Sequence, residues 1–423
     1  MKKQTINLIV ISILVSSIGA LFTQQTYAHA SDITSQKTYK TTPQTISNLY
    51  KKAYQSVQND DIDKLKRRFK LNAIHYSSAE DYLKKVTNFF DNYDPNLGLL
   101  QFLEEIIVQQ TLDKIENPGD IGKISSAWQA YLMYDSGFDR NGKIFQMMGP
   151  EPLPDPENTQ KRLIKVTEES TGEEISLNAF YLNQNSDTTI IATGGFRGNG
   201  WDINSPEVQL LKSFGYNVLL TESRSSGASE GKYISLGYYE KNDYTNWINN
   251  EVSIHLGQKV YLYGGSMGGA VVMGALNNAL PTNVKGLIEI AGFSSIDQEL
   301  TYLYDRISID LGNIFDWVLD FNPTQREATY KVLNEDLLIP KVKMSMYSSL
   351  PLEGVKTSTL PKLFIHGSAD NIIPYSNATL LYNSSAGSHN RIALIPGATH
   401  GGDIFVGEMG LKTKEAMDKF FND

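Results

Sequence analysis

Hydrophobic positions follow one period in the first third of the chain and a different period in the rest. Between about residues 45 and 148, apolar residues recur at helical spacing. The clearest helical segments are Tyr82–Phe90, Leu99–Val108 and Ala127–Met133. Asn117-Pro118-Gly119 is a turn signal between the last two of these segments. The pattern therefore predicts a small helical region before the main domain.

After the stiff, proline-rich segment 151–156 the pattern becomes that of short strands. Residues 161–168 and 175–182 flank a turn and predict an antiparallel hairpin. Six further apolar runs predict strands at Thr188–Thr193, Asn217–Thr221, Lys259–Tyr263, Gly286–Ile290, Lys362–His366 and Arg391–Ile395. Amphipathic segments such as 206–214 and 239–250 lie between them. The alternation predicts an α/β domain with a mostly parallel, eight-stranded sheet and helices on both faces.

One long insertion interrupts this alternation. Residues 296–350 separate two predicted strands and are helical in pattern and rich in aromatic residues. Long insertions in compact domains usually form lids or binding elements. We therefore expect a helical lid, with a helical decoration of the sheet edge as the alternative.

The first thirty residues have the pattern of a secretory signal peptide. Lys2 and Lys3 precede an apolar run from Ile6 to Phe22, and Ala28-His-Ala30 supplies an A-x-A cleavage site. We expect cleavage after Ala30 and an extracellular protein; an uncleaved segment would instead anchor the chain at the membrane, near the cell wall. The predicted organisation is a signal peptide (1–30), an N-terminal helical region with its linker (31–158) and a catalytic domain (159–423).

Composition narrows the class of protein. The chain of 423 residues has a formal net charge of −9, and its densest basic cluster, Lys64-Leu-Lys-Arg-Arg68, fits a solvated helix face. These features argue against a nucleic-acid partner. There is no cysteine, which excludes disulfides, a cysteine nucleophile and cysteine metal ligands.

Residues 259–274 carry the strongest functional signal. An apolar run ends in small residues centred on Ser266 and continues as a helical pattern, which predicts a strand, a sharp turn and a helix. The spacing Gly264-x-Ser266-x-Gly268 fits a nucleophile elbow, where flanking side chains would collide with the strand and the helix. The alternative is a tight packing turn without chemistry.

A second G-x-S-x-G match, Gly227 to Gly231, lacks this context. The preceding apolar run Val218–Leu220 stops well before Ser229, and no helical pattern follows. We therefore interpret Ser229 as a serine in a loop.

A serine hydroxyl needs a positioned base, and the base needs an acceptor that fixes its tautomer. Of the six histidines, His400 stands in a glycine-rich loop after the last predicted strand, where sites of open α/β sheets lie. Asp370, after the strand that ends at His366, is the favoured acid. Asp297 and Asp403 are its rivals; Asp403 is too close to His400 in sequence to reach its far ring nitrogen comfortably.

The developing oxyanion requires preset N–H donors. One donor should be Met267, directly after the nucleophile. The other should come from the glycine-rich loop after the strand at 188–193, where Phe196 is the candidate. A phosphate cradle is the weaker interpretation of this loop, because no G-x-G-x-x-G pattern or P-loop lysine follows.

Taken together and in this order, the motifs of residues 159–423 resemble the α/β-hydrolase family. They are most similar to secreted or membrane-anchored bacterial serine hydrolases of the acyl-transferase and prolyl-oligopeptidase-like branches. The matching segments are Gly195–Gly200, Glu222–Gly231, Gly264–Gly269, His366–Pro374 and Gly397–His400. The resemblance implies the α/β-hydrolase fold, Ser266 as nucleophile, Asp370 as acid, His400 as base and the insertion as a cap.

Two segments depart from the family pattern. The family usually has His-Gly where this chain has Gly194-Gly195, and often Asp-x-Arg-Gly-His-Gly where Glu222-Ser-Arg-Ser-Ser-Gly stands here. Both departures affect the support of the site more than the triad. No motif covers residues 31–158.

The sequence thus favours a secreted serine hydrolase that cleaves carboxylic esters through an acyl-enzyme and requires no metal or cofactor. Its substrate would be a small molecule or a short peptide. A peptidase or amidase is the first alternative, because the same triad serves both reactions. A non-catalytic binding protein that keeps the fold is the second.

Overall fold

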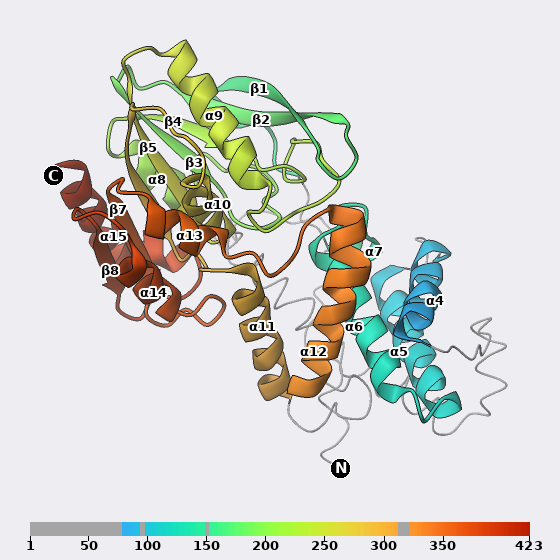
Figure 1. The fold of residues 1–423 in the computed structure, drawn as a ribbon. Helices are drawn as coiled ribbons and strands as arrows, with labels where there is room; N and C mark the ends of the chain where they lie inside the picture. The colour runs from blue at the N-terminus through green and yellow to red at the C-terminus, as the bar shows by residue number, and fades with distance from the viewer. Residues whose placement is uncertain (1–77, 94–97, 149–151, 312–321) are drawn as a thin grey trace, which may run out of the picture. The chain divides into compact units, whose positions relative to one another are not determined.

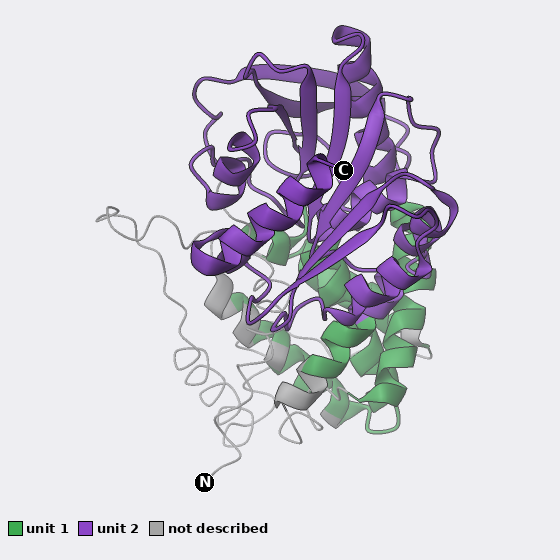
Figure 2. Cartoon of the chain, turned by 90° about the vertical axis from the view of Figure 1, so that its left-hand side faces the viewer, with its two compact units in different colours: residues 1–20, 31–149, 301–345 green, residues 21–30, 150–300, 346–423 purple. Residues whose placement is uncertain are grey.

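The computed structural model describes residues 78–93, 98–148, 152–311 and 322–423. These residues form two compact units, shown in different colours in Figure 2. The described part of the first unit comes from residues 31–149 and 301–345, and that of the second from 150–300 and 346–423. The predicted signal peptide lies outside the described residues, as does everything else before residue 78.

An eight-stranded sheet forms the centre of the second unit (Figure 1). Its strands are β1 (Gln160–Thr167), β2 (Glu174–Leu182), β3 (Thr188–Thr193), β4 (Asn217–Thr221), β5 (Lys259–Gly265), β6 (Val284–Ile290), β7 (Lys362–Gly367) and β8 (Arg391–Ile395). The spatial order is β1-β2-β4-β3-β5-β6-β7-β8, with β2 antiparallel to both neighbours and the strands from β4 to β8 parallel. This is the α/β-hydrolase fold, and every predicted strand is confirmed.

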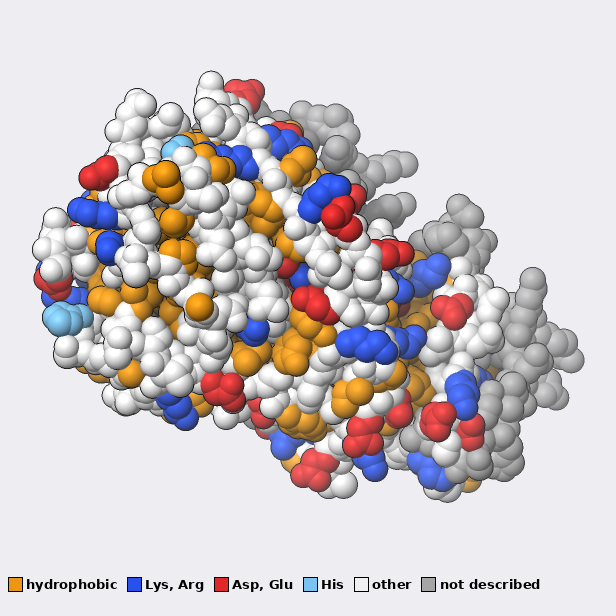
Figure 3. Space-filling view, turned by 45° about the horizontal axis from the view of Figure 1, so that its top comes forward, with side chains coloured by type: hydrophobic (Ala, Val, Ile, Leu, Met, Phe, Trp, Pro, Cys, Tyr) orange, Lys and Arg blue, Asp and Glu red, His pale blue; other side chains and the backbone are white. Residues whose placement is uncertain are grey.

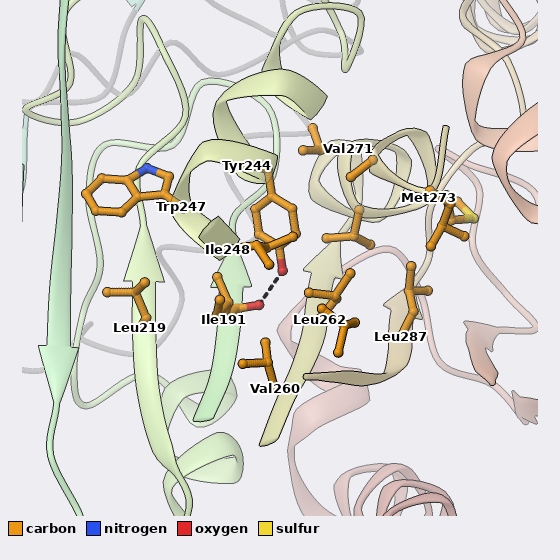
Figure 4. Packing of buried hydrophobic residues seen from close by; sticks show 14 of the residues in the cluster. Ile191, Leu219, Tyr244, Trp247, Ile248, Val260, Leu262, Val271, Met273 and Leu287 are labelled. Carbon is orange, nitrogen blue, oxygen red and sulfur yellow. Dashed lines mark hydrogen bonds between the residues drawn. The ribbon is translucent and has the colours of Figure 1, made fainter. Parts of the chain in front are cut away.

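Helices cover both faces of the sheet, as predicted. They are α8 (Pro206–Lys212), α9 (Glu240–Ile254), α10 (Met267–Ala275), α13 (Leu350–Thr357), α14 (Ser376–Ser384) and α15 (Gly407–Phe421), with the short 3-10 helix η4 (Gly402–Phe405). One core cluster joins the sheet to α9, α10, α13 and α14, and the other joins it to α8 and α15. In Figure 4, Trp247 and Ile248 of α9 pack above Leu219 and Ile191, while the Tyr244 hydroxyl donates a hydrogen bond to the Ile191 carbonyl oxygen. This packing on both faces holds the strands in place and so fixes the positions of their carboxyl ends.

The first unit is built from helices in its described part, with short turns between them. Its helices are α4 (Ala79–Asp91), α5 (Gly98–Glu116), α6 (Ile121–Gly137), α7 (Lys143–Met148), α12 (Pro323–Val332), the π-helix η3 (Leu333–Val342) and α11 (Ile296–Leu311) from Thr301 onward. The three predicted helical segments fall within α4, α5 and α6, and 117–119 separates α5 from α6 as expected. Aromatic rings fill the core: Phe90 lies 5.2 Å from Phe102 and 4.6 Å from Tyr131 between ring centroids.

The helical insertion belongs to this first unit rather than to the sheet-bearing one. We expected residues 296–350 to be part of the catalytic domain, but 301–345 group with the N-terminal helices. Buried hydrogen bonds explain the grouping, because the Gln129 side-chain oxygen accepts from the Tyr304 hydroxyl at 2.9 Å and from the Thr329 hydroxyl at 2.7 Å. The insertion thus packs against α6 through two buried hydrogen bonds.

Two further observations concern the charged side chains on the described surface and the apolar character of the described helices. On the face drawn in Figure 3, side chains of Lys and Arg are interspersed with those of Asp and Glu, and apolar patches lie between them. Among the described helices, none combines the length and the apolar character needed to cross a membrane.

Candidate active site

Ser266 occupies the sharp turn between β5 and α10. Its backbone has φ 55° and ψ −125°, a conformation that side-chain-bearing residues rarely adopt. Strand β5 ends at Gly265 and α10 begins at Met267, so the serine is the single residue of the turn. The strand, turn and helix predicted from residues 259–274 are therefore present.

The two glycines of the motif are required by close backbone approach. A Cβ atom on Gly264 would lie 2.1 Å from the Gly268 carbonyl oxygen, and one on Gly268 would lie 2.4 Å from the Thr193 carbonyl oxygen. Both distances are far below van der Waals contact, and the atoms met are backbone atoms that cannot swing aside. The elbow therefore packs against β3 only because these positions lack side chains.

We expect Gly268→Ala to lower the free energy of unfolding by about 3 kcal/mol or more, because its methyl group would overlap the backbone of Thr193. Gly198→Ala is the matched control, since a Cβ there meets only the Gly195 carbonyl oxygen at 3.7 Å. Its effect should stay within about 0.5 kcal/mol. Urea unfolding of both variants measures the difference, and equal stabilities would contradict the packing argument.

His400 lies within hydrogen-bond distance of the serine. Its Nε2 atom is 2.9 Å from the Ser266 hydroxyl oxygen, and its Nδ1 atom is 2.8 Å from Asp370 Oδ2. With Nδ1–H donating to the carboxylate, Nε2 is left as the acceptor for the serine O–H. The structure thus brings together the three residues that the sequence placed at the ends of β5, β7 and β8.

The loop after β7 holds the Asp370 carboxylate. Its Oδ1 atom accepts hydrogen bonds from the backbone N–H groups of Ile372 and Ile373, both at 2.9 Å. Burial alone would raise the pKa of Asp370, but hydrogen bonds from His366 and His400 outweigh burial and lower the pKa to about 2. The carboxylate is therefore ionised throughout the neutral range and can stabilise a protonated imidazole.

Sequence reasoning missed the second histidine on this carboxylate. The fully buried His366 ring places Nε2 2.8 Å from the Ile373 carbonyl oxygen and 3.2 Å from Asp370 Oδ2. A carbonyl oxygen only accepts, so Nε2 carries the proton and is shared between the two oxygens. The sequence signal that could have revealed this contact is the spacing of four residues between His366 and Asp370 across a turn.

The rival residues have other partners. Buried Ser229 accepts from the Asn178 N–H at 2.8 Å and donates to the Glu222 carbonyl oxygen at 2.9 Å, as expected of a loop serine. Asp403 Oδ2 accepts from the Thr399 N–H and hydroxyl, both at 3.0 Å. Asp297 lies in the first turn of α11. Within the described residues, the carboxylate paired with His400 is that of Asp370.

The two candidate oxyanion donors flank the nucleophile. Met267 opens α10 directly after Ser266, and Phe196 lies in the glycine-rich loop after β3. A Cβ on Gly195 would be 3.4 Å from Ser266 Cβ, which shows how closely this loop approaches the serine. The Ser266 N–H is already bonded to the Ile290 carbonyl oxygen at 2.8 Å. The backbone amides of Phe196 and Met267 therefore lie in the two segments next to the serine.

The segment after β4 that departs from the family pattern is held by a buried ion pair to Asp243 and by hydrogen bonds to the Glu222 carboxylate. Arg224 donates from two nitrogens to the two carboxylate oxygens of Asp243, at 2.7 and 2.8 Å. The Glu222 carboxylate accepts from the Asn178 side-chain amide and the Ala228 N–H, both at 2.9 Å. The acidic residue and the arginine of the usual pattern are thus kept as Glu222 and Arg224, while Ser225 and Ser226 stand where the pattern has Gly and His.

A cavity of about 490 Å³ opens beside Ser266. Its apolar wall includes Phe196, Pro206, Ile290, Ile404, Phe405 and Val406. The ionisable side chains in its lining are Glu207, His400 and Asp403. Within the described ranges, this cavity included, no three or more His, Cys, Asp or Glu side chains gather in a way that could hold a metal ion. The arrangement thus places a largely apolar cavity beside a hydroxyl that has a base within hydrogen-bond distance.

No protein-family model matches the sequence. Protein YqkD of Bacillus subtilis (strain 168), described as uncharacterised, is 27% identical over 190 residues, which are 43% of this chain and 54% of YqkD. The chain thus spans about half the length of this curated relative.

Several solved structures are similar at low sequence identity. Esterase Pf2001 of Pyrococcus furiosus has a TM-score of 0.47 at 16% identity, covering 65% of this chain and 97% of its own. The acylaminoacyl peptidase of Pyrococcus horikoshii has a TM-score of 0.42 at 19% identity, covering 67% and 43%. The bromoperoxidase of Bacillus anthracis has a TM-score of 0.41 at 16% identity, covering 62% and 100%. The fold assignment itself rests on the strand order described above.

Proposed function

We propose that this protein is a secreted serine hydrolase that cleaves carboxylic esters through a covalent acyl-enzyme. One observation carries the proposal: Ser266, His400 and Asp370 form a continuous chain of contacts at 2.9 and 2.8 Å on a strained elbow. A packing turn alone would not require a buried carboxylate, a correctly oriented imidazole and a serine in this conformation.

In the proposed reaction, Ser266 Oγ attacks the ester carbonyl carbon while its proton passes to His400 Nε2. Backbone N–H groups of Phe196 and Met267 stabilise the oxyanion, and Asp370 stabilises the imidazolium that forms. When the C–O bond breaks, the leaving alkoxide takes the proton from His400. Water then attacks the acyl-enzyme with His400 as base, which releases the carboxylic acid and restores the serine.

The test combines covalent labelling with a comparison of substrates. The protein should be recovered from the culture medium with Ser31 as its first residue, and a fluorophosphonate probe should label it. We expect faster turnover of short p-nitrophenyl esters than of aminoacyl p-nitroanilides. Faster anilide cleavage would make the protein a peptidase or amidase. Absence of both labelling and turnover would leave only a binding role for the fold.

A further inference from the structure

Glu207 places a carboxyl group in the wall of the cavity beside the nucleophile. It lies in the first turn of α8 and is enclosed by protein atoms, yet its side chain keeps partial access to solvent through the cavity. A Cβ on Gly265 would be 3.4 Å from Glu207 Oε1. Because Gly265 directly precedes Ser266, the carboxyl group lies over the strand end that presents the nucleophile.

A buried tyrosine fixes the orientation of this carboxyl group. The Tyr263 hydroxyl, on β5, donates to Glu207 Oε1 at 2.9 Å, and Tyr263 is 0% exposed. Among the described residues, Tyr263 alone donates a hydrogen bond to the Glu207 side chain, and no cation pairs with it. The second carboxylate oxygen therefore remains available to a ligand.

The cavity provides no positive charge to match the carboxyl group. Among the residues that line it, none is Lys or Arg. Asp403 accepts two hydrogen bonds from Thr399 at Oδ2, and its Oδ1 atom is enclosed by protein without a hydrogen-bond partner among the described residues. Burial raises the pKa of Glu207, and the hydrogen bond from Tyr263 opposes this effect only in part. An ionised carboxylate without a cationic partner is unfavourable in an apolar cavity, and a ligand that supplies a cation removes that cost.

We propose that Glu207 binds a primary ammonium group of the substrate, so that the enzyme prefers esters whose acyl part is an amino acid with a free α-amino group. This inference rests on the proposed function. An α-amino group is separated from the scissile carbonyl carbon by one carbon atom. A carboxylate over the strand end next to Ser266 is suitably placed to bind it while the hydroxyl attacks the carbonyl. The charge-assisted hydrogen bond would position the ester as well as bind it.

The test compares L-alanine p-nitrophenyl ester with p-nitrophenyl propionate, which lacks only the amino group. Both are assayed at pH 6.5, where the amine is protonated. Glu207→Gln should lower the ratio of kcat/KM values, alanyl over propionyl, by about ten- to hundredfold, the effect of one charged hydrogen bond. Its propionyl kcat/KM should change less than about threefold. Because the ratio is compared between variants, the different intrinsic reactivities of the two esters cancel.

Asp403→Asn is the matched control, because this carboxyl group lines the same cavity but is bonded within its own loop. Its alanyl-to-propionyl ratio should equal that of the wild type. Retained fluorophosphonate labelling shows that each variant is folded. An unchanged ratio in Glu207→Gln would overturn the inference and indicate a protonated Glu207 that a glutamine can replace, while the hydrolase proposal stands. A wild-type protein that turns over neither ester and is not labelled by the fluorophosphonate would overturn both.

Discussion

Ser266→Ala is expected to lower kcat on p-nitrophenyl esters by about 10⁶-fold, because the three residues of the triad act as a unit. The residual rate would come from the oxyanion donors and the cavity alone. The variant should fold normally, since its backbone keeps the same strained turn and the lost hydroxyl is bonded only to His400 among the described residues. Steady-state kinetics and fluorophosphonate labelling measure the loss.

Ser229→Ala gives the opposite combination of effects and so serves as the control. It removes a buried hydroxyl that accepts from Asn178 and donates to Glu222, which should lower the free energy of unfolding by about 1–3 kcal/mol. Labelling and kcat should stay close to those of the wild type below the unfolding transition. Loss of labelling in Ser229→Ala with retention in Ser266→Ala would show that the nucleophile lies in the other G-x-S-x-G segment.

The strands were predictable because each is a short β-branched run between turn signals. Once the strands were identified, Ser266, Asp370 and His400 could be placed at the carboxyl ends of parallel strands, where side chains converge. Strand β5 continues two residues beyond the predicted end, to Gly265. Glycine has no apolar side chain to signal a strand, although its backbone here pairs with β6.

Other features could not be predicted, because hydrophobic periodicity shows which face is buried but not against what. The assignment of the insertion to the helical unit depends on partners such as Gln129 and Thr329, which are 200 residues apart. Glu207 was overlooked because a glutamate in the first turn of a helix is favourable there without any other role. His366 acts on Asp370 only because the loop after β7 folds back over the strand end.

Asp370→Asn is expected to lower kcat/KM by about 10⁴-fold with little change in the fold. The asparagine side-chain oxygen can still accept from the N–H groups of Ile372 and Ile373, which leaves its NH₂ group facing His400 Nδ1. An NH₂ donor favours the imidazole tautomer with the proton on Nε2. That tautomer cannot accept the Ser266 proton, so the base is lost even though the imidazole remains in place.

The same substitution also disturbs the second histidine, and this makes the test specific. His366 donates from Nε2 toward the oxygen that the NH₂ group would replace, so two donors would face each other in a buried site. Asp403→Asn, in the rival carboxyl group, should change kcat/KM less than about tenfold because Asp403 is bonded to Thr399 rather than to His400. If Asp403→Asn caused the larger loss, the acid of the triad would be Asp403, and the pairing of His400 with Asp370 would be structural only.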